Sequence, residues 1–125
     1  MAPVTARRVL VVDDDPALRA LLCEILQRLG LSAAAAADGG EGAELFERDP
    51  TFDLVITDLL MPRLSGWDLI QRLRAANPAI PIILLAGNLG SDDMERARRS
   101  GVRTLRKPVQ IPELHGAVTG ALDDA

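Results

Sequence analysis

Residues 9–30 read VLVVDDDPALRALLCEILQRLG, which is an apolar run, an acidic triplet and a long helical pattern. Asp15 can cap the helix, Pro16 suits its first turn, and Gly30 can adopt the left-handed conformation that ends a helix. Leucine and isoleucine recur at the i, i+3, i+4, i+7 spacing of one helix face. The residues expected on this buried face are Leu18, Leu21, Leu22, Ile25, Leu26 and Leu29. The stretch therefore predicts a strand over residues 9–12, an acidic turn and an amphipathic helix.

The rest of the chain repeats this alternation of short apolar runs and helical patterns. The later runs are residues 33–37, 54–56, 80–85 and 102–105. The later helical patterns are about residues 41–48, 67–76 and 92–99, and a last helix, entered through Pro112, with apolar positions Leu114, Ala117, Val118, Ala121 and Leu122. The second run is alanine alone and the last is diluted by Arg103 and Thr104, so only the alternation supports these two strands. This order favours a parallel sheet with helices on both faces.

Length and composition favour one domain. A chain of 125 residues that is 48% hydrophobic can bury a core, and we expect a single domain over residues 1–125. Cys23 is the only cysteine, which excludes an internal disulfide. No apolar run approaches the ~18 residues that cross a bilayer, and residues 1–8 lack the apolar stretch of a secretory signal. We therefore expect a cytoplasmic protein without a membrane partner.

The charge balance argues against direct nucleic-acid binding. The formal net charge is -4, whereas affinity for duplex DNA comes largely from clustered lysine and arginine. Aromatic residues make up 2% of the chain and tyrosine is absent, so a base-stacking surface is not expected either.

Polar residues follow the predicted strands at the edge where ligands bind in an open parallel sheet. They are Asp13, Asp14 and Asp15 after the first run, Asp58 after the third, Ala86, Gly87 and Asn88 after the fourth, and Lys107 and Pro108 after the fifth. The carboxylates at 13, 14 and 58 would repel one another unless a cation neutralised them, and Mg²⁺ prefers such oxygen ligands. An aspartate can act as a nucleophile toward phosphorus, and Lys107 could pair with a phosphoryl oxygen.

Each of these features alone also has an ordinary structural explanation. The acidic triplet could be a polar turn with a helix cap, Asp58 a loop carboxylate, and Lys107 with Pro108 a simple turn. Several other residues are expected to be structural: Cys23 and Trp67 as packing residues, His115 as a solvated helix residue, and Arg96, Arg98 and Arg99 as a solvated helix face or a dock for an acidic partner. The joint placement of three acids and one lysine favours the phosphoryl interpretation.

Three stretches, VLVVDDDP (9–16), LVITDLLMPRLSG (54–66) and LRKP (105–108), together resemble the receiver domain of bacterial two-component response regulators. The resemblance runs from about residue 8 to residue 122. It implies a CheY-like, flavodoxin-like α/β fold: one doubly wound, five-stranded parallel sheet with strand order 2-1-3-4-5 and helices on both faces.

The same resemblance implies a role for each matching residue. Asp58 would be the phosphoacceptor and Lys107 the lysine that pairs with the phosphoryl group. Asp13, through water, and Asp14 would hold Mg²⁺ together with Asp58, and the backbone carbonyl of Leu60 would be a further ligand.

Two structural details and the partners follow from the resemblance as well. Gly66 matches the glycine of the turn after the acceptor loop, and the bond between Lys107 and Pro108 is expected to be cis. The phosphoryl donor would be a sensor histidine kinase or a histidine phosphotransfer protein, and an unknown downstream protein would receive the signal. Such a chain is not an enzyme toward other substrates, because it catalyses only its own phosphorylation and dephosphorylation.

The sequence departs from the family pattern at two switch positions. Ala86 stands where the family usually has Thr or Ser, and Thr104 stands where an aromatic residue is usual. The segment between Gly101 and Lys107 is also one residue short. We therefore expect either an atypical output that uses the backbone N–H of Gly87 or loop ordering, or a weak coupling between phosphorylation and output.

Two other functions remain open at this stage. The first is a degenerate receiver that binds a partner without phosphorylation, for which Ala86 and Thr104 are the support. The second is a phosphatase of the haloacid dehalogenase type, whose D-x-D motif Asp13 and Asp15 formally meet. Ala17 does not fit that motif, and 125 residues are short for that fold.

Overall fold

The computed structural model describes residues 7–123, and the chain forms five strands and five helices in strict alternation. The strands are β1 (Arg8–Val12), β2 (Ser32–Ala36), β3 (Leu54–Asp58), β4 (Ile82–Ala86) and β5 (Arg103–Arg106). The helices are α1 (Pro16–Arg28), α2 (Gly39–Arg48), α3 (Gly66–Ala76), α4 (Ser91–Ser100) and α5 (Ile111–Asp123). Residues 1–6, on which most of the expectation about a secretory signal rests, lie outside the described residues.

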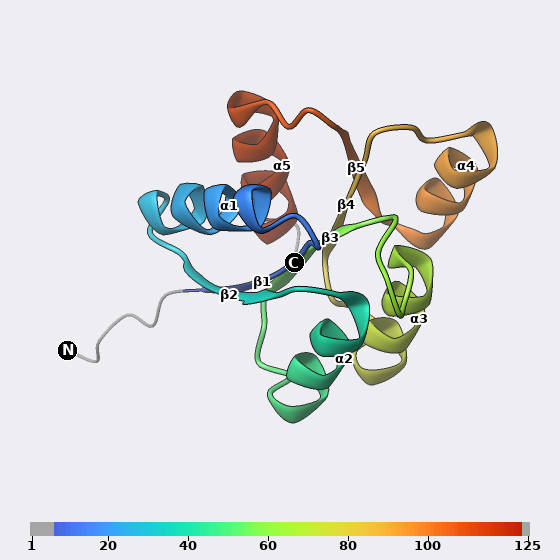
Figure 1. Ribbon diagram of the computed structural model, residues 1–125, viewed down its shortest axis with the longest axis horizontal. Coiled ribbons are helices and arrows are strands. Elements are labelled where there is room, and N and C mark those ends of the chain that lie inside the picture. Colours follow the sequence, from blue (N-terminus) through green and yellow to red (C-terminus); the bar gives the residue numbers. More distant parts are fainter. Residues whose placement is uncertain (1–6, 124–125) are drawn as a thin grey trace.

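All strand pairs are parallel and the sheet order is β2-β1-β3-β4-β5, which confirms the expected fold class. Helices α1 and α5 cover one face of the sheet, and α2, α3 and α4 cover the other (Figure 1). Alternate residues of each central strand therefore enter opposite cores, as the two-residue period of a strand requires. In β1, for example, Leu10 and Val12 pack with α2 and α3, whereas Val9 and Val11 pack with α1 and α5.

The strand boundaries correct the expectations by one or two residues. The third strand extends to Asp58, which pairs with Leu85, because the ladder of backbone hydrogen bonds does not depend on hydrophobicity. The fourth strand begins at Ile82 rather than at residue 80. Asn77 causes this delay, because its side chain and its carbonyl hold the N–H groups of residues 79 and 80 in a turn. The carboxylate of Asp58 is thus attached to a strand, not to a loop.

Helix α1 has the expected ends but a narrower buried face. The carboxylate of Asp15 accepts hydrogen bonds from the first turn, and Gly30 has a φ of 83°. Leu22 is fully buried, but Leu21 is 46% exposed and Leu29 is 38% exposed, so the prediction was wrong for these two leucines. Leu21 is rotated about 100° from its neighbour Leu22 around the helix, which turns it off the sheet. Leu29 is the C-cap and lies beyond the last helical turn.

Helix α4 is attached to the rest of the molecule mainly by polar contacts. Ala97 is its only buried residue, and the N-cap makes no side-chain hydrogen bond. The indole N–H of Trp67, on α3, donates to the carboxylate of Asp93 at 3.0 Å. The guanidinium of Arg96 lies over the indole ring, 4.6 Å from its centre. Trp67 is therefore a buried link between two helices, and Arg96 is not purely a solvated residue.

None of the helices in residues 7–123 combines the length and the apolar character that crossing a membrane requires.

Candidate functional site

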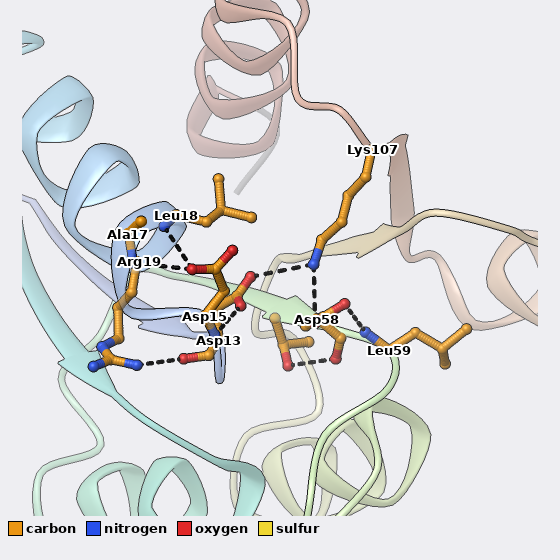
Figure 2. A network of polar contacts seen from close by, with 9 residues as sticks. Asp13, Asp15, Ala17, Leu18, Arg19, Asp58, Leu59 and Lys107 are labelled. Carbon is orange, nitrogen blue, oxygen red and sulfur yellow. Dashed lines mark hydrogen bonds and ion pairs between the residues drawn. The ribbon is translucent and has the colours of Figure 1, made fainter.

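The carboxyl ends of β1, β3 and β5 bring three charged side chains together at one edge of the sheet (Figure 2). Asp13 follows β1, Asp58 ends β3, and Lys107 follows β5. The ammonium of Lys107 lies 3.0 Å from Oδ2 of Asp58 and 3.6 Å from Oδ2 of Asp13. One lysine thus lies between two carboxylates that are 45 residues apart in sequence.

Asp13 has an incomplete set of partners. It is fully buried, and its Oδ1 accepts the backbone N–H of Asp15 at 2.8 Å. Its Oδ2 has no hydrogen-bond partner among the described residues, since Lys107 is at an ion-pair distance and not at a hydrogen-bond distance. Burial raises the pKa of Asp13 above its ordinary value, although the Asp15 N–H and the charge of Lys107 act in the opposite direction. A buried oxygen of this kind fits an additional cation.

The donor set matches a hard divalent ion. Asp13, Asp14 and Asp58 each offer a carboxylate oxygen, and these oxygens lie within 4.8 Å of one another. Asp14 is exposed, so the cluster opens to solvent on that side. Carboxylate oxygens with space for water are the ligands that Mg²⁺ usually takes, so the residues present fit this ion.

Two opposing effects set the charge of Lys107. Burial lowers its pKa, but the hydrogen bond to Asp58 and the charges of Asp13 and Asp58 outweigh burial, so the pKa is raised. The side chain therefore stays an ammonium. Its backbone N–H donates to the carbonyl of Ala86 at 2.9 Å, which continues the β4–β5 ladder beyond β5. The bond between Lys107 and Pro108 is cis, as the resemblance implies.

Asp58 is held on both carboxylate oxygens. Oδ2 accepts from Lys107, and Oδ1 accepts the backbone N–H of Leu59 at 2.9 Å. Gly66 packs directly beneath this point, because a Cβ there would lie 2.5 Å from the carbonyl oxygen of Asp58 and 2.8 Å from Cα of Leu59. Its N–H also donates to the carbonyl of Leu59 at 2.7 Å. Only glycine fits this close approach of two backbone segments.

An open pocket of about 350 Å³ lies beside the Asp58 carboxylate. The residues that line it are Asp58, Leu59, Leu60, Ala86, Gly87, Asn88 and Lys107. The expected residues Leu60, Ala86 and Gly87 are therefore all in the pocket wall, and position 86 contributes no side-chain hydroxyl. Thr104 is not part of the wall, since its hydroxyl lies 4.0 Å from the sulfur of Met94 on α4. The space can hold a small anionic group next to the carboxylate.

Two contacts in the site were not anticipated. Arg19, on α1, donates to the backbone carbonyl of Asp13 at 2.7 Å and fixes the acidic turn. Nothing in the sequence separates this arginine from one on the helix surface. Asp15 uses its carboxylate as the cap of α1 and does not join Asp13 at the site, so the arrangement gives no support to the D-x-D phosphatase hypothesis.

Comparison with known proteins places this geometry in a family. A family model of the response regulator receiver domain matches residues 9–119. The response regulator receiver protein Anae109_2439 of Anaeromyxobacter sp. (strain Fw109-5) is 36% identical over 109 residues, which are 86% of this chain and 45% of that protein. The transcriptional regulatory protein GlrR of Escherichia coli (strain K12) is 36% identical over 118 residues, which are 94% of this chain and 26% of that protein.

Solved structures agree with the sequence relatives. A response regulator receiver domain protein from Clostridium thermocellum superimposes with a TM-score of 0.88 at 30% identity, covering 94% of this chain and 95% of that chain. A response regulator receiver protein from Pseudomonas putida has a TM-score of 0.84 at 33% identity, covering 94% and 99%. The chain spans less than half the length of the curated relatives above. It belongs to the response regulator receiver domain family, the signalling modules of two-component systems.

Proposed function

We propose that this receiver domain accepts a phosphoryl group on Asp58 in a reaction that depends on Mg²⁺. The observation that carries the proposal is the contact of the Lys107 ammonium with Asp58, beside a buried Asp13 oxygen that lacks a hydrogen-bond partner. The open pocket next to Asp58 gives the incoming group a place. Phosphoryl transfer needs mainly alignment and charge neutralisation, which such an arrangement supplies.

The residues divide the chemistry among them. A carboxylate oxygen of Asp58 forms a bond to phosphorus while the bond from phosphorus to a donor histidine nitrogen breaks, and its electron pair stays on that nitrogen. Lys107 pairs with a phosphoryl oxygen. Asp13, Asp14, Asp58 and the carbonyl of Leu60 would hold Mg²⁺, which when bound would neutralise negative charge on the phosphoryl oxygens. Attack of water on phosphorus later restores the Asp58 carboxylate.

The donor we propose is a sensor histidine kinase or a histidine phosphotransfer protein. Histidine kinases phosphorylate receiver domains as a family, which supports this choice. We also propose that residues 8–122 form the core of one receiver domain and that the chain acts on no other substrate. A downstream protein would read the phosphorylated state.

The output step is proposed to be atypical. Ala86 offers no hydroxyl to follow a phosphoryl oxygen, and Thr104 contacts α4 instead of the pocket. The backbone N–H of Gly87, which is exposed at the pocket wall, is the donor left for this task. The same two substitutions favour a second candidate function, an interaction module that works without phosphorylation.

Intact mass after treatment with an acyl phosphate and Mg²⁺ tests the proposal. We expect one added phosphoryl group on the wild-type chain, none on Asp58→Asn, and normal labelling of Asp123→Asn, an exposed acid at the end of α5. Labelling of Asp58→Asn at the wild-type level would show that the acceptor is another residue. No labelling of the wild type together with no response to Mg²⁺ would favour the interaction module.

A further inference from the structure

The loop between β3 and α3 contains a strained turn. Arg63 has a φ of 70°, the only positive φ of a non-glycine residue within residues 7–123. The N–H of Leu64 donates to the carbonyl of Pro62 at 2.8 Å across this residue. A three-residue turn with a positive φ at its centre is the rare, strained form of the γ-turn. Strain of this kind persists only where the surroundings impose it, and it is enriched at functional sites.

The side chain of Arg63 is fastened to α2. Its guanidinium lies 3.3 Å from Oδ2 of Asp38 and 3.9 Å from the carboxylate of Glu44. Asp38 is the N-cap of α2, and its other oxygen accepts the N–H of Glu41 at 2.8 Å. One carboxylate therefore both caps the helix and holds the arginine, so the position of the guanidinium is tied to the start of α2.

Two consecutive glycines make room for this arrangement. A Cβ on Gly40 would lie 2.6 Å from Nη2 of Arg63. A Cβ on Gly39 would lie 2.3 Å from the carbonyl oxygen of Leu64. At Gly39 the neighbour is backbone, which indicates a steric requirement for glycine. At Gly40 the neighbour is the end of the Arg63 side chain, which a methyl group would displace. The first turn of α2 therefore carries no side chain at the two positions that the strained turn approaches.

The same loop touches the phosphoacceptor at its other end. The N–H of Leu59 donates to Asp58, and the N–H of Gly66 closes the loop onto the carbonyl of Leu59. Leu60, which lines the pocket, is 77% exposed. Leu59, Met61 and Leu64 pack against the core on the α2–α3 face. The closure at Gly66 and the attachment of Arg63 to α2 add to this packing in setting the course of residues 59–66.

We propose that Arg63 is a positioning residue for the phosphoacceptor site. The guanidinium lies against Gly40 and pairs with Asp38, and Leu64 lies against Gly39. These contacts hold residues 59–66 in the course that places Leu60 in the pocket wall. This inference rests on the function proposed above, because it assigns the loop a part in binding Mg²⁺. An exposed ion pair adds little to global stability, so the effect belongs to the loop and to the metal, not to folding.

Arg63→Ala removes the ion pairs to Asp38 and Glu44, whereas Arg63→Lys keeps a positive charge at this position. Mg²⁺ affinity, measured from amide chemical shifts without any phosphodonor, should fall about tenfold in Arg63→Ala, a typical size for loss of a residue that orients a ligand. Amide exchange at Leu64 and Gly66 should accelerate, while the urea midpoint stays at the wild-type value. Arg63→Lys keeps the charge and should recover most of the affinity.

Gly40→Ala is the more informative variant, because we expect it to raise or preserve thermal stability while it lowers Mg²⁺ affinity. Alanine is the better helix former, so thermal stability should rise or stay constant. The added methyl displaces the guanidinium, so Mg²⁺ affinity should fall as in Arg63→Ala. In the Arg63→Ala background, Gly40→Ala should cause no further loss, since the group it displaces is gone.

Three outcomes would overturn the proposal: wild-type Mg²⁺ affinity and amide exchange in Arg63→Ala, wild-type behaviour of Gly40→Ala, or additive losses in the double variant. If the wild-type chain binds no Mg²⁺, the proposed function fails by itself. The positioning role is then decided by amide exchange at Leu64 and Gly66, which needs no metal.

Discussion

Two regions of the molecule are held together in different ways: the group of Asp13, Asp58 and Lys107, called here the acceptor corner for its proposed function, and β5 with α4, called the α4 edge. At the acceptor corner, Asp13 and Asp58 are buried, and backbone N–H groups and Lys107 hold their carboxylates. At the α4 edge, β5 has no buried residue and α4 has only Ala97. A region with few buried apolar contacts opens at a lower free energy than a packed one. The residues of the proposed phosphoryl chemistry are thus more tightly held than α4 and β5, and we expect the α4 edge to open at the lower free energy.

The largest effect is expected for Gly66→Ala at the acceptor corner. The added Cβ would meet backbone atoms of Asp58 and Leu59, which cannot move aside as a flexible side chain can. The free energy of unfolding should fall by about 3 kcal/mol, at the upper end for overpacking. Gly116→Ala in α5 is the matched control, because nothing lies within 4 Å of its Cβ, and it should stabilise slightly. Urea unfolding measures both, and equal midpoints would contradict the close approach.

Asp13→Asn should stabilise the protein in the absence of Mg²⁺. The neutral amide removes a buried charge, and the net raised pKa shows that burial of this charge outweighs its attraction to Lys107. Because the folded-state pKa of Asp13 is raised, ionisation disfavours the folded state, and this penalty is fully present only above the folded pKa. The gain should therefore be largest at neutral pH and shrink as pH falls toward 3.8, the unperturbed value.

Urea unfolding of the wild type and of Asp13→Asn across this pH range, with and without Mg²⁺, measures whether the variant gains or loses free energy of unfolding. Added Mg²⁺ should stabilise the wild-type protein more than the variant. A variant that is less stable than wild type at neutral pH without Mg²⁺ would show that Asp13 is satisfied in a way that its contacts do not reveal.

Trp67→Phe tests how α4 is attached. Phenylalanine keeps an aromatic ring beneath Arg96 but loses the N–H that donates to Asp93, at a cost of about 1.5 kcal/mol for a hydrogen bond to a charged group. Amide exchange should accelerate in α4 and change little in α1. The control Arg98→Ala removes only exposed ion pairing within α4 and should cost less than about 0.5 kcal/mol. Equal acceleration in every helix would refute a local attachment.

Ala86→Thr should have the smallest effect on stability and a visible effect on the output. The new hydroxyl would face the pocket and give a phosphoryl oxygen a donor that the wild-type side chain lacks. Amide shifts on binding a phosphate mimic should extend further into β5 and α4 than in the wild type. Ala86→Val has nearly the same shape without the hydroxyl and should behave like wild type. Identical shifts for all three proteins would remove any role for position 86.

The sequence predicted the fold class because each apolar run is short and lies between helical patterns, and only the strand order needed the family resemblance. It also predicted that Asp13, Asp58 and Lys107 converge, because the carboxyl ends of parallel strands share one edge. The boundaries were harder. Asn77 delays β4 through hydrogen bonds to two backbone N–H groups, and hydrophobicity does not report such bonds.

The arrangement around Arg63 was missed for a related reason. A backbone dihedral angle leaves no mark on an apolar pattern, and arginine is an unusual residue for a positive φ. The signal that could have found it was the pair Gly39–Gly40, which lies directly before the helix predicted over about residues 41–48 and forms the first turn of α2 in the structure, where glycine is unfavourable. Gly40 contacts Arg63, which is 23 residues away in the sequence, so the reason for this glycine can be seen only in the three-dimensional structure.

Residue 86 holds the backbone of Lys107 through its carbonyl, which accepts the Lys107 N–H, and it lines the pocket with its side chain. Every amino acid has a backbone carbonyl, so this hydrogen bond to the N–H of Lys107 does not depend on the side chain of residue 86. Under the proposed function, the side chain at position 86 could therefore change while the Lys107 ammonium stays beside Asp58. We therefore expect that a substitution at position 86 can alter the proposed output without removing the proposed ability to be phosphorylated.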